Sequence, residues 1–185
     1  MSTVSKAAPR VSSRGRAMPA SPIRKLMPLA DEARRRGVRV YHLNIGQPDL
    51  ETPPQMRARL AALQDRTYAY SPSAGTPEYL AALRDYYGKL GVSLSLDELI
   101  ATTGGSEAVL FAFFTATDQG DEALVVEPYY TNYRAFATMA GVTLKALPSR
   151  VEDGFHLPPR PAWEKAIGPR TRLVLLCNPN NPTGT

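Results

Sequence analysis

The sequence contains few of the residues that form metal sites and disulfide frameworks. Its 185 residues include one cysteine and two histidines, and the histidines, His42 and His156, lie far apart in the chain. One cysteine cannot form a disulfide within the chain, so we expect Cys177 to be a small buried thiol in a reducing, cytoplasmic compartment. We expect no metal site.

Long hydrophobic runs are also missing. No apolar segment approaches the roughly 18 residues that a membrane-spanning helix requires, so we expect no membrane span. The hydrophobic share of 43% and the charged share of 21% are typical of a soluble globular protein. The length allows one ordinary domain, or one domain with an appendage.

Positive charge is concentrated in the N-terminal region rather than spread over the chain. The net charge is +5, yet residues 1–30 hold six basic residues and no acid, so the remainder has one more acidic than basic residue. Nucleic-acid-binding proteins usually present a basic face on the folded part, so we expect no nucleic-acid partner. We predict that residues 1–25 form a basic, flexible arm. Their serine and arginine content also fits an organelle transit peptide.

Short apolar segments alternate with helical patterns along the rest of the chain. Strands are predicted at 98–103, 122–128, 142–148 and 171–179. Helices are predicted at 24–37 (interrupted near Pro28 and closed by Gly37), 75–91 (capped by Thr76), 105–116 (buried), 130–141 and 161–168. This alternation predicts an α/β fold with a mostly parallel sheet between helices. The apolar run 173–176 is typical of a strand buried on both faces.

Three turns follow predicted strands, at the carboxyl ends where parallel sheets bind ligands. TTGGSEAV (102–109) places glycines and a serine at a helix start, where free N–H groups and the helix dipole favour an anion. EPYYTNY (127–133) adds tyrosines, and NPNNPTG (178–184) adds carboxamides. Each turn alone is compatible with ordinary packing or capping. Together they predict a phosphate site, an aromatic ring and an amide donor on one rim.

These motifs resemble those of the class I and II, fold type I pyridoxal-phosphate aminotransferases, and are similar to the aspartate aminotransferase group. The resemblance covers roughly residues 12 to 185 and rests on LNIGQPDLETP, YAYSPSAGTPE, TTGGSEAV, EPYY and NPNNPTG, in the order of the family. It implies a fold type I transferase that moves an amino group between an L-amino acid and a 2-oxo acid, in amino-acid metabolism and biosynthesis.

The resemblance implies cofactor-binding roles for six residues, five of them for the site of their own subunit and the sixth, Tyr70, for the neighbouring site. Gly104, Gly105 and Ser106 would hold the phosphate of pyridoxal 5′-phosphate. Tyr130 would stack on the pyridine ring, at a position where many relatives have tryptophan. Asn181 would donate a hydrogen bond to the phenolic oxygen of the cofactor and would also contact substrate.

The resemblance also implies substrate contacts and a partner subunit. Gly46 would offer its backbone to the substrate α-carboxylate. Tyr70 would reach the phosphate in the neighbouring subunit's site, which implies a homodimer with shared active sites. Residues 26–60 would contribute to the small domain, and residues 61–185 would form part of the large cofactor-binding domain.

The sequence lacks the catalytic residues that the family places after NPTG. These are a lysine that forms a Schiff base with the cofactor, an acid beside the pyridine nitrogen and an arginine for the substrate carboxylate. None of the five lysines fits the family motif. We therefore interpret the chain as an N-terminal fragment with a truncated large domain, and we expect it to be inactive and poorly folded alone.

Other functions remain compatible with the motifs. Carbon–sulfur lyases and amino-acid decarboxylases of fold type I share this half of the sequence. A ligand-sensing domain of a transcription regulator would need a DNA-binding domain in front, and about 25 residues of tail cannot form one. A non-catalytic, truncated binding protein is the third alternative.

Overall fold

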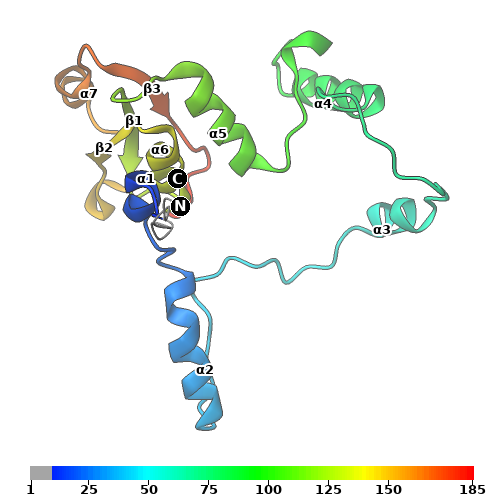
Figure 1. The fold of residues 1–185 in the computed structure, drawn as a ribbon, viewed down its shortest axis with the longest axis horizontal. Helices are drawn as coiled ribbons and strands as arrows, with labels where there is room; N and C mark the ends of the chain where they lie inside the picture. Colours follow the sequence, from blue (N-terminus) through cyan, green and yellow to red (C-terminus); the bar gives the residue numbers. More distant parts are fainter. Residues whose placement is uncertain (1–9) are drawn as a thin grey trace, which may run out of the picture. The chain divides into compact units, whose positions relative to one another are not determined.

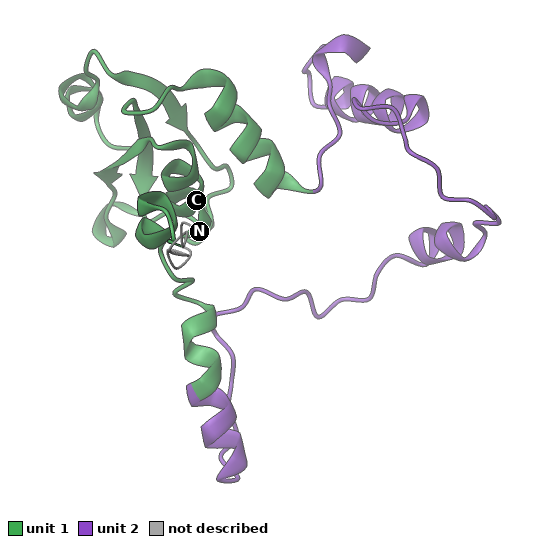
Figure 2. Ribbon diagram, viewed as in Figure 1, with its two compact units in different colours: residues 1–28, 104–185 green, residues 29–103 purple. Residues whose placement is uncertain are grey.

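The computed structural model describes residues 10–185, which divide into two compact units (Figure 2). The first unit comprises residues up to 28 together with 104–185, and the second comprises residues 29–103. Part of the predicted flexible arm, residues 1–9, lies outside the described residues. Within the rest of the arm, Ser13–Ala17 forms the short helix α1, whose N-cap Ser12 accepts a hydrogen bond from the Gly15 N–H (3.0 Å). A 3₁₀ turn, η1, follows at Arg24–Leu26.

A three-stranded parallel sheet is the centre of the first unit (Figure 1). Strand β1 (Glu122–Glu127) lies between β2 (Thr143–Pro148) and β3 (Thr171–Leu175). In register, Leu124 of β1 lies opposite Lys145 of β2 and Val174 of β3. These three strands confirm the prediction of a parallel sheet from short apolar runs.

Helices lie on both faces of this sheet. On one face, α5 (Gly105–Ala116) and α6 (Asn132–Ala140) enclose a core of Phe113, Ala123, Ala137 and Val142. On the other face, α7 (Arg160–Ala166) packs beside β2, preceded by the 3₁₀ turn η3 (Val151–Asp153). The predicted sandwich of a parallel sheet between helices is therefore confirmed.

Two segments with the sequence pattern of buried elements, α5 and β3, are partly exposed in this unit. Of the α5 residues only Phe113 is buried, and the Phe114 side chain next to it is 56% exposed. In β3, Leu173 and Leu175 pack against the core, but Val174 faces outward and is exposed. The reason is that β3 is an edge strand of the described sheet, and no described helix covers the outer face of Val174.

The second unit is helical. It contains most of α2 (Met27–Arg35), then α3 (Pro54–Ala61), α4 (Pro77–Lys89) and the 3₁₀ turn η2 (Leu96–Glu98). The predicted start of α4 is confirmed, because Thr76 Oγ1 accepts a hydrogen bond from the Tyr79 N–H (3.4 Å) and Pro77 is the first helical residue. The segment predicted to be interrupted near Pro28 is divided between the 3₁₀ turn η1, which ends at Leu26, and α2, which begins at Met27; Pro28 lies in the first turn of α2, where its missing N–H costs no hydrogen bond.

The strand predicted at 98–103 is not formed. Residues 96–98 form η2, closed by a capping box in which the Ser95 N–H donates to Glu98 Oε2 (2.8 Å). The chain then continues without ladder pairing, and the Ala101 N–H donates to the Ala74 carbonyl oxygen (2.7 Å). Within residues 10–185, no helix is both long enough and apolar enough to span a membrane.

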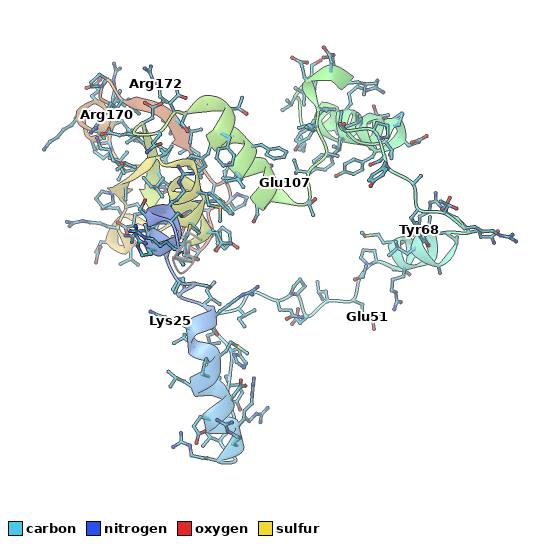
Figure 3. The ribbon with its side chains drawn as sticks, in the orientation of Figure 1. Lys25, Glu51, Tyr68, Glu107, Arg170 and Arg172 are labelled. Atoms are coloured by element: carbon cyan, nitrogen blue, oxygen red, sulfur yellow. The ribbon has the colours of Figure 1, made fainter. Side chains whose placement is uncertain are left out.

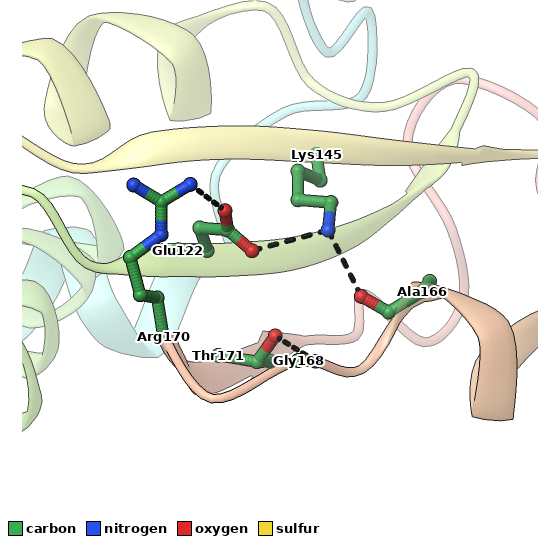
Figure 4. A network of polar contacts seen from close by, with 6 residues as sticks. All are labelled: Glu122, Lys145, Ala166, Gly168, Arg170 and Thr171. Carbon is green, nitrogen blue, oxygen red and sulfur yellow. Dashed lines mark hydrogen bonds and ion pairs between the residues drawn. The ribbon is translucent and has the colours of Figure 1, made fainter.

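Glu122 belongs to a polar network that links four segments at the amino end of the sheet (Figure 4). Its carboxylate accepts hydrogen bonds from Lys145 Nζ (3.1 Å) and Arg170 Nη2 (2.7 Å), and Lys145 Nζ also donates to the Ala166 carbonyl oxygen of α7 (3.0 Å). Glu122 is only 8% exposed, so its charge is compensated by two cations rather than by water. These contacts connect β1, β2, α7 and the start of β3.

We expect Glu122→Gln to lower the free energy of unfolding at neutral pH and to lose this effect in acid. The hydrogen bond from Lys145, assisted by the one from Arg170, lowers the pKa of Glu122 below its ordinary value of 4.5. A lowered folded-state pKa stabilises the fold above pH 4.5, and this stabilisation disappears as the pH falls through the folded-state pKa.

Urea denaturation of wild type and variant across pH 7 to pH 3 measures this difference. Glu152→Gln, at an exposed glutamate with no ion pair among the described residues, is the matched control. A Glu122→Gln effect that stays constant across this range would contradict the assignment.

Candidate functional site

The turns that follow β1 and β3 lie against each other. Because the two strands are parallel, both turns leave the carboxyl edge of the sheet. Asn180 Nδ2 donates to the Pro128 carbonyl oxygen (3.0 Å) and to Thr183 Oγ1 (2.9 Å). The structure therefore brings two of the three predicted turns together, through a residue that sequence reasoning did not single out.

The two adjacent asparagines of the NPNNPTG turn have different environments. Asn180 is half-buried, and its backbone closes the turn by donating to the Thr185 carbonyl oxygen (2.6 Å) and accepting from the Gly184 N–H (2.7 Å). The Asn181 side chain is exposed and makes no hydrogen bond to any residue in 10–185. Asn180 thus holds the turn, and the Asn181 carboxamide is available to a ligand.

Three tyrosines cluster after β1. The ring of Tyr133 is stacked on Tyr129 (centroids 6.4 Å apart, 18° between planes) and meets Tyr130 edge to face (5.5 Å, 86°). Burial, with a hydrogen bond to the Cys177 thiol, raises the pKa of Tyr133 to about 12. Tyr133 is therefore neutral at physiological pH and serves as a packing centre. Asn132 Nδ2 donates to the Tyr130 hydroxyl oxygen (2.7 Å).

A cavity of about 310 Å³ adjoins these tyrosines at the strand ends. Its walls include Tyr129, Tyr133, Cys177 and Asn180, whereas the Tyr130 and Asn181 side chains do not line it. Cys177 is half-buried rather than fully buried, and its thiol donates to the Pro179 carbonyl oxygen (3.4 Å). The described residues contain no cluster of three or more His, Cys, Asp or Glu that could hold a metal ion.

The N-terminus of α5 carries the predicted phosphate site, Gly104, Gly105 and Ser106, which we call the phosphate cradle. Gly104 has φ +81°, a left-handed conformation that favours glycine, and no side chain caps the helix there. A Cβ added at Gly104 or Gly105 would meet no atom within 4 Å, so the space beside the helix end is open. The Gly105 and Ser106 N–H groups donate to no described residue, as expected of the first turn of a helix.

This helix end suits an anion. The twelve residues of α5 place the positive end of the helix dipole at the cradle, and the exposed Ser106 hydroxyl adds a donor. Figure 3 labels Glu107 in the first turn of α5, where it is half-buried. Arg170 and Arg172, labelled in the same figure, lie at the amino end of β3, whereas the NPNNPTG turn follows the carboxyl end of that strand. The N–H groups of Gly105 and Ser106, the open space and the Ser106 hydroxyl are compatible with the predicted phosphate.

One buried polar atom in the tyrosine turn has no partner. Thr131 Oγ1, directly before α6, is shielded from solvent and makes no hydrogen bond to the described residues. Buried polar groups are usually paired, and exceptions are common at ligand sites.

Two predicted site residues belong to the second unit. Tyr70 is fully exposed, and an added Cβ at Gly46 would meet no atom within 4 Å. Both therefore have free surface around them within their own unit. The role of each residue stays a prediction.

Comparison with known proteins identifies the family. The sequence profile described as aminotransferase class I and II matches residues 38–185. The chain belongs to the class I and II aminotransferases. The resemblance predicted from the five motifs is thus confirmed, and pyridoxal phosphate is the expected cofactor of this family member.

Named relatives and solved structures agree with this assignment. The aspartate/prephenate aminotransferase of Thermus thermophilus is 37% identical over 156 residues, which are 83% of this chain and 40% of that protein. The aspartate aminotransferase of Pyrococcus horikoshii is 35% identical over 147 residues, or 78% of this chain and 37% of that protein. The crystal structure of the Rhizobium meliloti aspartate aminotransferase matches with a TM-score of 0.87 at 31% identity, covering 95% of this chain and 44% of that one. The chain spans about 40% of the length of these relatives.

Proposed function

We propose that the whole protein is a pyridoxal-phosphate-dependent aminotransferase that moves an amino group between an L-amino acid and a 2-oxo acid. The observation that supports it is the arrangement within the first unit: an open anion site at the start of α5, and the tyrosine and asparagine turns joined at the strand ends. The names of the relatives favour transamination over carbon–sulfur lyase or decarboxylase chemistry.

Each residue of the first unit would contribute to holding the cofactor. The Gly105 and Ser106 N–H groups and the Ser106 hydroxyl would donate to the phosphate, whose negative charge the helix dipole stabilises. Tyr130 would offer an aromatic face to the pyridine ring. Asn181, free of other hydrogen bonds in the described chain, would donate to the phenolic oxygen. When bound, pyridoxal phosphate supplies an electron sink for a carbanion, and the protein supplies orientation and electrostatics.

The second unit would contribute to substrate and subunit contacts. Gly46 has no side chain, so its backbone can approach the substrate α-carboxylate closely. Tyr70 would reach the phosphate of a neighbouring subunit in a homodimer with shared active sites, and its full exposure supports a role outside its own unit. We also propose a cytoplasmic location and a role in amino-acid biosynthesis.

Asn181→Ala tests the proposal. We expect the whole wild-type protein, supplied with pyridoxal phosphate, to transfer an amino group from aspartate to 2-oxoglutarate. Loss of one hydrogen bond to a charged oxygen, worth about 1.5–3 kcal/mol, should weaken cofactor binding by roughly tenfold to a hundredfold. It should also raise the pH midpoint of the visible absorbance of the bound cofactor, because the amide favours the anionic phenolic oxygen.

A second asparagine of the same turn provides the control for Asn181→Ala. Asn178→Ala, also exposed and in the same turn, should leave both values close to wild type. If the cofactor affinity and the pH midpoint of the absorbance were unchanged in Asn181→Ala, Asn181 would not contact the cofactor. A wild-type protein without cofactor-dependent transfer, tested against several amino-acid donors, would refute the proposed function itself.

A further inference from the structure

The ring of Tyr130 is held by groups of its own turn. The residue is half-buried and lies in the turn between β1 and α6, where a tyrosine side chain is free to rotate unless something fixes it. The Tyr133 N–H donates to the Tyr130 carbonyl oxygen (3.0 Å), which fixes the backbone. The Tyr133 ring meets the Tyr130 ring edge to face, and Asn132 Nδ2 donates to the Tyr130 hydroxyl oxygen (2.7 Å).

Asn132 is itself on a rigid support. It is the first residue of α6, and this helix is fixed to the sheet by Ala137, which is 1% exposed in the core beside Phe113 and Ala123. Its half-buried side chain reaches back two residues to the tip of the Tyr130 ring. The hydrogen bond from Asn132 therefore connects the hydroxyl end of the Tyr130 ring to α6, and Tyr133 contacts the face or edge of the same ring.

We propose that Asn132 is a positioning residue, which fixes the Tyr130 ring in the orientation that stacks on the pyridine ring of the cofactor. The inference rests on the proposed function. A side chain that is already ordered before binding loses less rotational freedom when the ligand arrives, so a fixed ring binds more tightly than a mobile one. The tyrosine hydroxyl gives Asn132 an acceptor through which to hold the ring.

A double-mutant cycle in the whole apoprotein tests the proposal. The probe is pyridoxine 5′-phosphate, which has an alcohol in place of the aldehyde and so binds without a covalent bond to any lysine. Its dissociation constant is measured by calorimetry for wild type, Asn132→Leu, Tyr130→Phe and the double variant. We expect each single substitution to weaken binding by about threefold to tenfold, the range of one net hydrogen bond. The double variant should be no weaker than either single variant, because both remove the same contact.

Two further variants separate positioning from general destabilisation. Asn132→Gln keeps a neutral carboxamide that can donate to the Tyr130 hydroxyl oxygen, so it should restore affinity to within about twofold of wild type, which a general loss of folding would not allow. Arg134→Ala, on the exposed side of the same helix, should bind as wild type does. Asn132→Leu with wild-type affinity, additive losses in the double variant, or no rescue by Asn132→Gln would each overturn the role of Asn132 and leave the proposed function intact. A wild-type apoprotein that does not bind pyridoxine 5′-phosphate would overturn both.

Discussion

Ser106→Asp is expected to weaken the binding of pyridoxal phosphate by about a hundredfold to a thousandfold. The substitution places a carboxylate in the phosphate cradle and removes a hydroxyl donor. Two unit charges 4 Å apart near a protein surface repel each other by about 4 kcal/mol, and each 1.36 kcal/mol changes an equilibrium constant tenfold. Salt screening reduces the effect, and the double charge of the phosphate increases it.

The same substitution is expected to preserve the fold, or to stabilise it slightly. An acidic side chain in the first turn of a helix interacts favourably with the helix dipole, by about 0.3–1 kcal/mol at an exposed site. Ser106 is exposed and its side chain makes no hydrogen bond to the described residues, so no native contact is lost. If Ser106 lies in an anion site, Ser106→Asp binds the cofactor more weakly while the free energy of unfolding stays the same or rises slightly. If Ser106 served only as part of a helix start, the stability would change in this way and the cofactor affinity would not fall.

Cofactor titration and urea denaturation of three proteins measure these effects. The control, Ser106→Asn, introduces a side chain of the same size as aspartate but without its charge. It should therefore lose far less affinity for pyridoxal phosphate than Ser106→Asp does. Unfolding midpoints of all three should lie close together or slightly favour the aspartate variant. Equal affinity of Ser106→Asp and wild type would show that the phosphate binds elsewhere.

Much of the sheet could be predicted from local patterns. The runs that became β1, β2 and β3 are short, apolar and bounded by turn residues, and the helices between them carry caps such as Gly141 with φ +74°. These are properties of neighbouring residues, so sequence alone indicates them. Burial is different, because it depends on which elements pack together. Val174 and Phe114 have the composition of buried residues but lie on surfaces that no described element covers.

The same distinction applies to the candidate site. The two glycines before α5 could be read from the sequence as a turn that opens a helix, and Gly104 has a left-handed φ of +81° there, while the phosphate role of Gly104 and Gly105 stays a prediction. The helix Pro54–Ala61 was missed because its mixed basic and apolar residues show no clear apolar stripe. Asn180 and Asn181 are identical in type and adjacent, so no local pattern separates them. Only the hydrogen bond from Asn180 to Pro128, 52 residues away, shows which amide holds the turn and which is free.

Phe113→Ala is expected to lower the free energy of unfolding by about 3–5 kcal/mol, the usual cost of removing a buried phenylalanine ring. The Phe113 side chain is 0% exposed and packs with Ala123 of β1 and Ala137 of α6. The residues around the ring, which include Phe136 and Leu173 as well as the two alanines, relax only partly into the space that it leaves, so a cavity remains. Since a typical domain has a net stability of about 5–15 kcal/mol, the loss is a large part of the total.

Phe113 also attaches the phosphate cradle to the sheet. The cradle is the first turn of α5, and Phe113 is the only residue of that helix that is buried in the described chain. We therefore expect Phe113→Ala to weaken cofactor binding as well as the fold, and added cofactor to recover part of the lost stability through binding to the folded state. Phe114→Ala removes the same ring from the next, 56% exposed position and should cost much less in both measurements. Urea denaturation with and without cofactor measures both variants, and equal losses for the two would show that α5 is not held to the sheet through Phe113.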